Sequence, residues 1–402
     1  MSGNRAGDRV RWFVLSVFLL SSAINYLDRQ TLATLGPLLR AEFHLTTREF
    51  GWVIGIFSIA YAVAAPFAGA LIDRFGLNLS SSLAVGLWSV AGIATGFTRG
   101  LASMIACRTV LGVAESAGIP AAGKAIDSFL HPSQRALGNA LNQAGVSIGL
   151  IAAPPLAIWI ASHYGWRHAF AVTGAMGLLW IPIWNFTSRL LPQVPRAKNE
   201  AAGGPSPLRD PRLWAFVVAN ALTMFGYSLW TNWSSFYFVD VHHMPLEAAS
   251  RYVLAVFTLA AAGGFVGGWL SARLIAHGAV PQAARLKVCL AGAALSLFTA
   301  AIPATQTPFR AAAGIALSFF AVSAMSVNVY SLPLDTFGRD RAAFGIAALV
   351  SSYGAMQLVV SPIIGGMIDA HRWTPLIFAA TITPALACAV LYAVLYSGRQ
   401  RA

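Results

Sequence analysis

The sequence predicts an all-α membrane protein with twelve transmembrane helices in two pseudo-symmetric halves of six, on the basis of three observations. Of the 402 residues, 57% are hydrophobic and only 10% are charged, whereas soluble domains carry about 25% charged residues. The apolar residues gather in segments long enough to cross a bilayer, for which about 20 residues suffice. The two halves of the chain also share sequence landmarks. We therefore expect a polytopic membrane protein rather than a soluble domain.

Twelve apolar segments can be counted along the chain, six on each side of a polar linker. We expect an N-terminal six-helix bundle over residues 1–190, a flexible cytoplasmic linker over residues 191–210, and a C-terminal six-helix bundle over residues 211–402. The segments are approximately 10–39, 50–72, 79–98, 101–129, 136–161, 167–189, 211–239, 247–275, 284–303, 309–334, 342–369 and 374–397.

The two halves resemble each other at several anchors that keep one constant offset. The matched pairs are Gly138 with Gly345, Pro155 with Pro362, and Trp166 with Trp373. Two six-span repeats are the pattern of secondary transporters that bind substrate near the bilayer midplane.

The net charge of +13 could indicate nucleic-acid binding, but the basic residues fall mainly in alternate loops and form no long run. This distribution follows the positive-inside rule and places both termini in the cytoplasm. We expect no nucleic-acid partner. The three cysteines lie within apolar segments and suggest no disulfide framework, and the first segment is expected to be retained rather than cleaved as a signal peptide.

The first segment contains Asp28 and Arg29 in the middle of its apolar run. Charged residues at that depth cost about 2.5 to 3.5 kcal/mol each and usually mark a substrate or proton path, although a structural ion-pair node is the alternative. Neighbours on a helix point about 100° apart, so the two side chains should face different partners. Arg suits an anionic substrate because its planar, always-charged fork can grip a carboxylate with two hydrogen bonds.

The fourth segment contains Arg108 and Glu115, two helical turns apart and therefore on one face. We expect Arg108 to be the partner of Asp28, and Glu115 to be a desolvated acid among Gly and Ala residues that takes part in proton coupling. The alternative is an Arg–Asp–Glu tether that only locks two helices together. Lys124 and Asp127, three residues apart near the end of this segment, predict a local surface pair.

The stretch Gly69-Ala-Leu-Ile-Asp73-Arg74-Phe-Gly76 after the second segment, together with twelve spans and a central linker, resembles the major facilitator superfamily. In its second-half copy Ala272 stands in the position of Asp73, so a cytoplasmic latch would be weaker on that side. The resemblance implies that Asp73 and Arg74 act in gating. An Asp there could meet a helix N-terminus and stabilise an outward-open form.

Within that superfamily, the chain is similar to the anion:cation symporters and most of all to the hexuronate transporters of bacteria. The similarity rests on Asn25-Tyr-Leu-Asp-Arg29, on the run from Gly112 to Ala125, and on the run from Ala136 to Gly145. It covers the first half well and the second half more loosely. The resemblance implies that Arg29 binds the substrate carboxylate, that Asp28 and Glu115 handle protons, and that Tyr61 contacts substrate.

Sugar hydroxyls need short polar side chains and stacking aromatic rings. For these contacts we select Tyr26, Tyr61, Asn232, Tyr353 and Gln357. Most polar residues within the segments could equally serve helix packing.

We therefore expect a transporter, not an enzyme: a proton-coupled symporter of an organic anion in the bacterial inner membrane, with a hexuronate such as glucuronate or galacturonate as its cargo. Another carboxylate, such as an aldonate, an aldarate or a small organic acid, is the first alternative, and a proton-antiport exporter is the second. The chain has no phosphate-binding loop with Lys-Ser/Thr, so ATP is not the expected energy source. No cofactor and no metal are expected, and the protein should act as a monomer in the lipid bilayer.

Overall fold

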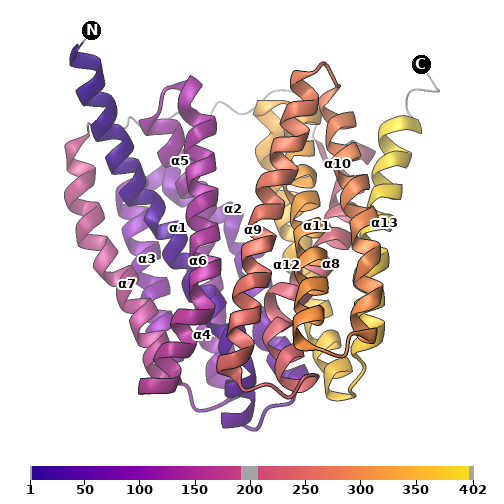
Figure 1. Ribbon diagram of the computed structural model, residues 1–402. Helices are drawn as coiled ribbons and strands as arrows, with labels where there is room; N and C mark the ends of the chain where they lie inside the picture. The colour runs from indigo at the N-terminus through magenta and orange to yellow at the C-terminus, as the bar shows by residue number, and fades with distance from the viewer. Residues whose placement is uncertain (1, 192–206, 398–402) are drawn as a thin grey trace. The chain divides into compact units, whose positions relative to one another are not determined.

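The computed structural model describes residues 2–191 and 207–397, and in those ranges the regular structure is helical throughout. Twelve stretches of these ranges are long and apolar enough to cross a membrane, which confirms the predicted number of spans (Figure 1). The predicted linker, residues 191–210, falls mostly outside the described residues.

The chain divides into two compact units, and the first consists of Met1–His44 and Trp52–Asn199. Its helices are α1 (Ser2–Glu42), α2 (Thr47–Phe75, from Trp52 onward), α3 (Leu77–Thr95), α4 (Leu101–Glu115), α5 (Gly118–Phe129), α6 (Arg135–Tyr164) and α7 (Trp166–Thr187). α1 packs along α6 and α7, and α3 packs along α7 and α4.

The fourth predicted span is interrupted between α4 and α5, which the sequence analysis did not predict. Glu115 is the last residue of α4, and α5 begins at Gly118. Pro120 cannot donate a backbone hydrogen bond to the carbonyl of Ser116, which favours a kink or a break in the helix at this point. The interruption places Glu115 at a helix end in the interior of the unit, where the residue is 1% exposed.

The second unit consists of Leu45–Gly51 and Glu200–Ala402. Its helices are α8 (Pro211–Asp240), α9 (Leu246–Ala276), α10 (Pro281–Ser296), the 3-10 helix η4 (Leu297–Ala304), α11 (Pro308–Phe337), α12 (Arg339–Asp369) and α13 (Trp373–Ser397). The landmarks that repeat in the sequence occupy corresponding elements. Pro155 lies in α6 and Pro362 in α12, while Trp166 begins α7 and Trp373 begins α13.

The first turn of α2 clusters with the second unit, where its backbone is bound by a carboxylate. Asp369, at the end of α12, accepts hydrogen bonds from the backbone N–H groups of Thr47 at 2.8 Å and Arg48 at 3.0 Å. Thr46 and Glu49 form a capping box, in which Glu49 accepts from the Thr46 N–H at 2.8 Å and Thr46 accepts from the Glu49 N–H at 3.1 Å. These contacts satisfy amides that a helix N-terminus leaves unpaired.

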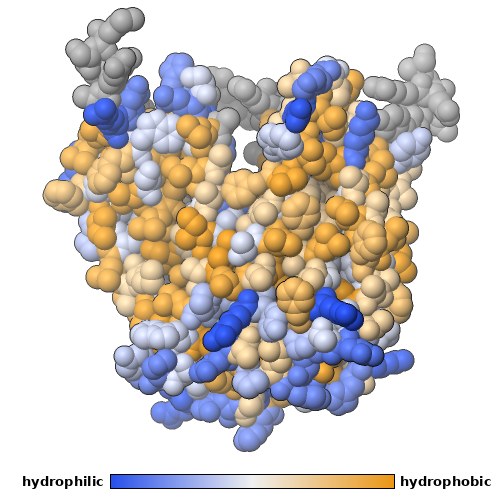
Figure 2. All heavy atoms as spheres, viewed as in Figure 1, coloured by the Kyte–Doolittle hydropathy of each residue, from blue (hydrophilic) through white to orange (hydrophobic). Residues whose placement is uncertain are grey.

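Close helix packing within each unit depends on small residues. A Cβ atom at Gly149 of α6 would lie 2.2 Å from the Ala23 carbonyl oxygen of α1, and one at Gly263 of α9 would lie 2.2 Å from the Phe320 carbonyl oxygen of α11. Such contacts allow backbones to approach as they do in membrane bundles. Apolar side chains cover the middle of the visible face of each unit, and hydrophilic ones gather at its ends (Figure 2).

Candidate functional site

The first unit contains an ion pair in its interior, between Arg29 of α1 and Glu115 of α4. The Glu115 Oε2 atom accepts from Arg29 Nη2 at 2.7 Å and from Arg29 Nε at 3.1 Å. The Glu115 side chain is 0% exposed and that of Arg29 is 26% exposed. The Arg29 side chain is therefore partly exposed, while its guanidinium is bound to a fully buried carboxylate.

Three aromatic rings surround the Arg29 guanidinium. Its central carbon lies 5.0 Å from the ring centroid of Tyr26, 4.7 Å from that of Phe57 and 5.1 Å from that of Tyr61. Tyr26 precedes Arg29 by three residues and so shares its face of α1. Aromatic faces attract a cation and also exclude water from it, so this enclosure strengthens any charge interaction that Arg29 makes.

α2 brings Phe57 and Tyr61 to the site because α4 lets it approach closely. A Cβ atom at Gly112 would lie 2.4 Å from the Phe57 carbonyl oxygen and 3.2 Å from the Tyr61 nitrogen. Gly112 stands one helical turn before Glu115, so any larger residue there would push α2 away from the ion pair. The glycine in this position therefore serves the geometry of the site.

Asp28 points away from Arg29, as the helical spacing predicts. Its Oδ1 atom accepts a hydrogen bond from the Thr173 hydroxyl of α7 at 2.8 Å, and both side chains are buried, at 1% and 0% exposure. The expected Asp28–Arg108 partnership is not a direct ion pair among the described residues, although the two charges act on each other electrostatically. The Arg108 guanidinium instead lies 5.9 Å from the ring centroid of Phe170, also in α7.

The physical reason for this difference is how far each side chain reaches. Seven residues place Arg108 and Glu115 on one face of α4, but spacing along one helix does not determine the height at which a neighbouring helix passes. The longer Arg29 side chain reaches Glu115 at the end of α4, whereas the shorter Asp28 side chain accepts a hydrogen bond from Thr173.

Three buried polar atoms of this charge cluster have no hydrogen-bond partner among the described residues: Asp28 Oδ2, Arg108 Nε and Glu115 Oε1. A buried polar atom without a partner is costly. The cluster therefore contains two acids, Asp28 and Glu115, and two arginines. Each acid has one oxygen that is hydrogen-bonded and one that is not. Such groups can accept protons or a further ligand.

The second unit contains a polar cluster that includes three of the residues predicted for sugar hydroxyls. Gln357 Nε2 donates to the Tyr353 hydroxyl at 3.0 Å, and Gln357 Oε1 accepts from the hydroxyls of Ser361, at 2.9 Å, and of Ser228. Asn232 Nδ2 donates to the Ser228 carbonyl oxygen at 3.1 Å. The amide oxygen of the buried Gln357 is thus fully used within the protein, and this network orients the Tyr353 hydroxyl.

Sequence reasoning did not select Thr173, Phe57, Ser228 or Ser361. A signal for the two serines was present, because Tyr353, Gln357 and Ser361 follow one another at four-residue steps on α12, and Ser228 and Asn232 do so on α8. Such steps place side chains on one helix face. No comparable signal marks Thr173, whose role depends on how α7 packs against α1.

Comparison with known proteins gives the family. Residues 18–359 match the Major Facilitator Superfamily. The chain belongs to this superfamily. It is therefore a transporter and a multi-pass membrane protein, as its resemblance to the family predicted.

Relatives of this superfamily member include the hexuronate transporter of Escherichia coli strain K12, which is 24% identical over 96% of this chain and 94% of its own length. The probable sulfoacetate transporter of Cupriavidus necator is 27% identical, with 85% of this chain and 86% of that protein covered. The D-galactonate transporter of Escherichia coli O6:H1 is 25% identical and covers 91% of both chains.

Solved structures confirm the fold. The crystal structure of a bacterial homologue of the human lysosomal transporter Spinster matches with a TM-score of 0.78 at 17% identity, over 96% of each chain. The superfamily fold of two six-helix halves is therefore confirmed.

The residues expected to act in gating lie at the end of α2. The Asp73 carboxylate forms an ion pair with the Lys124 ammonium of α5, and the Arg74 guanidinium lies 5.4 Å from the ring centroid of Phe75. The expected local Lys124–Asp127 pair is wrong: Asp127 is paired with Arg135 of α6 instead. The long Lys124 side chain reaches Asp73 on the neighbouring helix α2, and Asp127 pairs with α6. Contacts between helices therefore decide the pairing, not the three-residue spacing within α5.

In the second unit, where Ala272 replaces the aspartate, a different ion pair occurs near the same end of the helices. Arg285 of α10 donates from Nε to Asp335 of α11 at 3.1 Å and from Nη1 to the Ser271 hydroxyl of α9 at 2.7 Å. Both charged side chains are largely buried, at 18% and 13% exposure. Arg285 of α10 therefore joins three helices.

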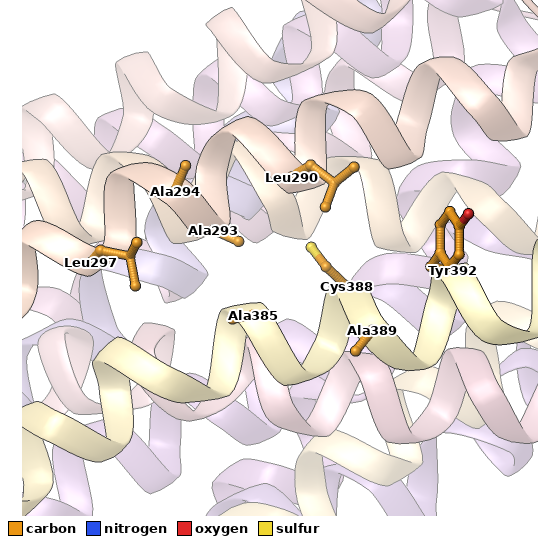
Figure 3. Close-up of a pocket in the computed structure, with 8 residues that line it drawn as sticks. All are labelled: Leu290, Ala293, Ala294, Leu297, Ala385, Cys388, Ala389 and Tyr392. Carbon is orange, nitrogen blue, oxygen red and sulfur yellow. The ribbon is translucent and has the colours of Figure 1, made fainter.

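A groove of about 450 Å³ lies between α10, η4 and α13 (Figure 3). Its lining carries no charged side chain, so it has none of the groups that an anionic substrate requires. The lining residues are Leu290, Ala293, Ala294, Leu297, Ala385, Cys388, Ala389 and Tyr392.

Proposed function

We propose that this superfamily member is a proton-coupled symporter of an organic anion, and that its cargo is a sugar acid, with a hexuronate such as glucuronate or galacturonate as the first candidate. The observation that carries the proposal is the Arg29–Glu115 ion pair inside an aromatic enclosure.

The geometry around Arg29 supports carboxylate binding. Its guanidinium already holds one carboxylate oxygen with two donors, and its side chain remains 26% exposed. A substrate carboxylate has the same charge and shape as that of Glu115. It can therefore take the place of Glu115 on Arg29, with Tyr26 and Tyr61 against the sugar ring.

Proton coupling follows from this exchange. When Glu115 takes up a proton it loses its charge, and its bond to Arg29 weakens. An arginine left without an anion in a buried site is costly, so the substrate carboxylate is then favoured as its new partner. By reciprocity, substrate binding favours protonation of Glu115 by the same factor. Proton and anion therefore bind together and cross together.

The polar cluster around Gln357 supports a sugar rather than a simple carboxylate. Tyr353 and Asn232 belong to a hydrogen-bonded network that fixes their orientation, and oriented hydroxyl and amide groups can bind sugar hydroxyls selectively. We assign them the hydroxyl contacts, and we assign Gln357 the orientation of Tyr353.

The names of the relatives support an acidic cargo. Hexuronate, D-galactonate and sulfoacetate, after which those transporters are named, are all carboxylates. The D-galactonate and sulfoacetate relatives favour a second candidate, in which the same mechanism serves an aldonate, an aldarate or a small carboxylate. We place the protein in the bacterial inner membrane as a monomer, with both termini cytoplasmic and with Asp73 and Arg74 acting in gating.

The proposal is tested with purified protein in liposomes. Uptake of radiolabelled glucuronate, galacturonate, galactonate and glucarate is measured with and without an inward proton gradient. We expect at least one of them to accumulate only when the gradient is imposed. The proposal would be refuted if protein-free liposomes took up every acid as well as liposomes with the protein do. Accumulation that does not depend on the proton gradient would also refute it.

A further inference from the structure

Asp28 lies in the interior between two helices that contribute no charge to it. A Cβ atom at Gly92 of α3 would lie 2.8 Å from Asp28 Oδ2, so α3 closes one side. On the α7 side, Thr173 donates to Asp28 Oδ1 at 2.8 Å. The Asp28 side chain is 1% exposed, and its Oδ2 atom has no partner among the described residues. Thr173 therefore supplies the hydrogen bond that this carboxyl group has.

The Thr173 hydroxyl has two acceptors within reach but only one hydrogen. Its Oγ1 atom lies 2.8 Å from Asp28 Oδ1 and 3.3 Å from the Phe170 carbonyl oxygen. A hydroxyl donates one hydrogen bond and accepts up to two. When Asp28 is ionised, the hydroxyl can donate to it. When Asp28 is protonated, the hydroxyl can turn toward Phe170 and accept a hydrogen bond from the acid.

We propose that Thr173 is the positioning residue of Asp28 and keeps this acid hydrogen-bonded in both of its protonation states. For its relevance to transport the proposal rests on the proposed function, with Asp28 as a second proton-handling acid beside Glu115. A proton-carrying acid in a membrane interior has no water to replace a lost partner. The hydrogen-bond geometry itself does not depend on that function.

The charged groups that act on Asp28 come from two helices. Arg29 lies on α1 itself, and Arg108 and Glu115 lie on α4. α3 and α7 face Asp28 with Gly92 and Thr173. In α5, which also packs against α1, Lys124 and Asp127 are paired with Asp73 and Arg135. α6 has its charged residues near its ends.

The test is an infrared titration of the substrate-free protein. The difference between the parent protein and Asp28→Asn isolates the band of the protonated Asp28 carboxyl group, and its intensity is followed against pH. Thr173→Val removes the hydroxyl while keeping the shape of the side chain. Removing a hydrogen-bond donor destabilises an ionised carboxylate more than a neutral acid. The midpoint of the Asp28 titration should therefore rise by about one pH unit in Thr173→Val.

Two variants control for packing. Thr173→Ser keeps the hydroxyl and should titrate as the parent does. Thr187→Val, on the same helix, removes a hydroxyl that bonds only to carbonyl oxygens of Ile183 and Trp184, and it should leave the midpoint unchanged. An unchanged midpoint in Thr173→Val would overturn the proposal. An equal shift in Thr173→Ser would also overturn it, because packing would then be the cause.

The transport consequence is measured separately in liposomes. Thr173→Val should move the pH of half-maximal uptake in the same direction, while Thr173→Ser and Thr187→Val should not. A parent protein that shows no gradient-driven uptake would refute the proposed function. The infrared midpoints would still decide whether Thr173 positions Asp28.

Discussion

Replacing Glu115 with glutamine tests the exchange of partners on Arg29. Glutamine has the shape of a protonated glutamate, so Glu115→Gln should leave Arg29 without a charged competitor. The variant should bind the cognate anion well even at alkaline pH, where the parent protein must first protonate Glu115. It should also exchange labelled for unlabelled substrate across the membrane, yet fail to accumulate substrate when a proton gradient is imposed.

The size of the effect follows from the contacts that are lost. Arg29 donates to Glu115 at 2.7 and 3.1 Å, and the acid is fully buried. A hydrogen bond to a charged group contributes about 1.5 to 3 kcal/mol, and about 1.4 kcal/mol corresponds to a tenfold change in affinity. At alkaline pH we therefore expect Glu115→Gln to bind substrate about 10- to 100-fold more tightly than the parent protein.

Isothermal titration at several pH values measures this difference, with the exposed Glu247→Gln as a matched control. The affinity of the parent protein should weaken as pH rises, and that of Glu115→Gln should not. Equal affinities at alkaline pH would refute the displacement of Glu115. Accumulation by Glu115→Gln under a proton gradient would show that Glu115 is not the coupling acid.

Three further predictions concern other charged groups. Arg29→Lys should lose most substrate affinity, because an ammonium cannot replace the planar fork; titration measures this, with the exposed Arg251→Lys as control. Asp73→Asn leaves Lys124 without its acidic partner and should shift the resting population toward inward-open, as cysteine accessibility from either membrane face would show. Asp210→Ala removes the N-cap of α8 and should cost about 1 kcal/mol of stability. Hydrogen bonds from Arg212 lower the pKa of Asp210, so this stability is present above its ordinary pKa and is lost as pH falls through the lowered one. Unchanged affinity, accessibility or thermal unfolding, respectively, would contradict these predictions.

The twelve spans could be predicted from the sequence because length and apolar composition are local properties of a segment. The direction of neighbouring side chains was also predictable, since the rotation between Asp28 and Arg29 is set by the helix itself. Both Arg29 and Glu115 could be selected as charges that are costly in a membrane.

The pairing of those charges could not be predicted, because it depends on the height and distance at which different helices pass each other. For that reason Arg108 was assigned to Asp28, whereas Thr173 donates to it and Glu115 binds Arg29. Pro120 was a sequence signal for the helix break after Glu115. The apolar run over residues 101–129 continues across that break, however, and so predicted one uninterrupted helix.

The most direct test of the account measures protons rather than transport. The purified protein is placed in weakly buffered solution at a pH where Glu115 is ionised, and the cognate sugar acid is added as its salt at the same pH. We predict that binding draws protons from the solution, so that the pH rises in the parent protein and stays constant in Glu115→Gln. Binding without proton uptake by the parent protein would contradict the exchange of Glu115 for substrate on Arg29.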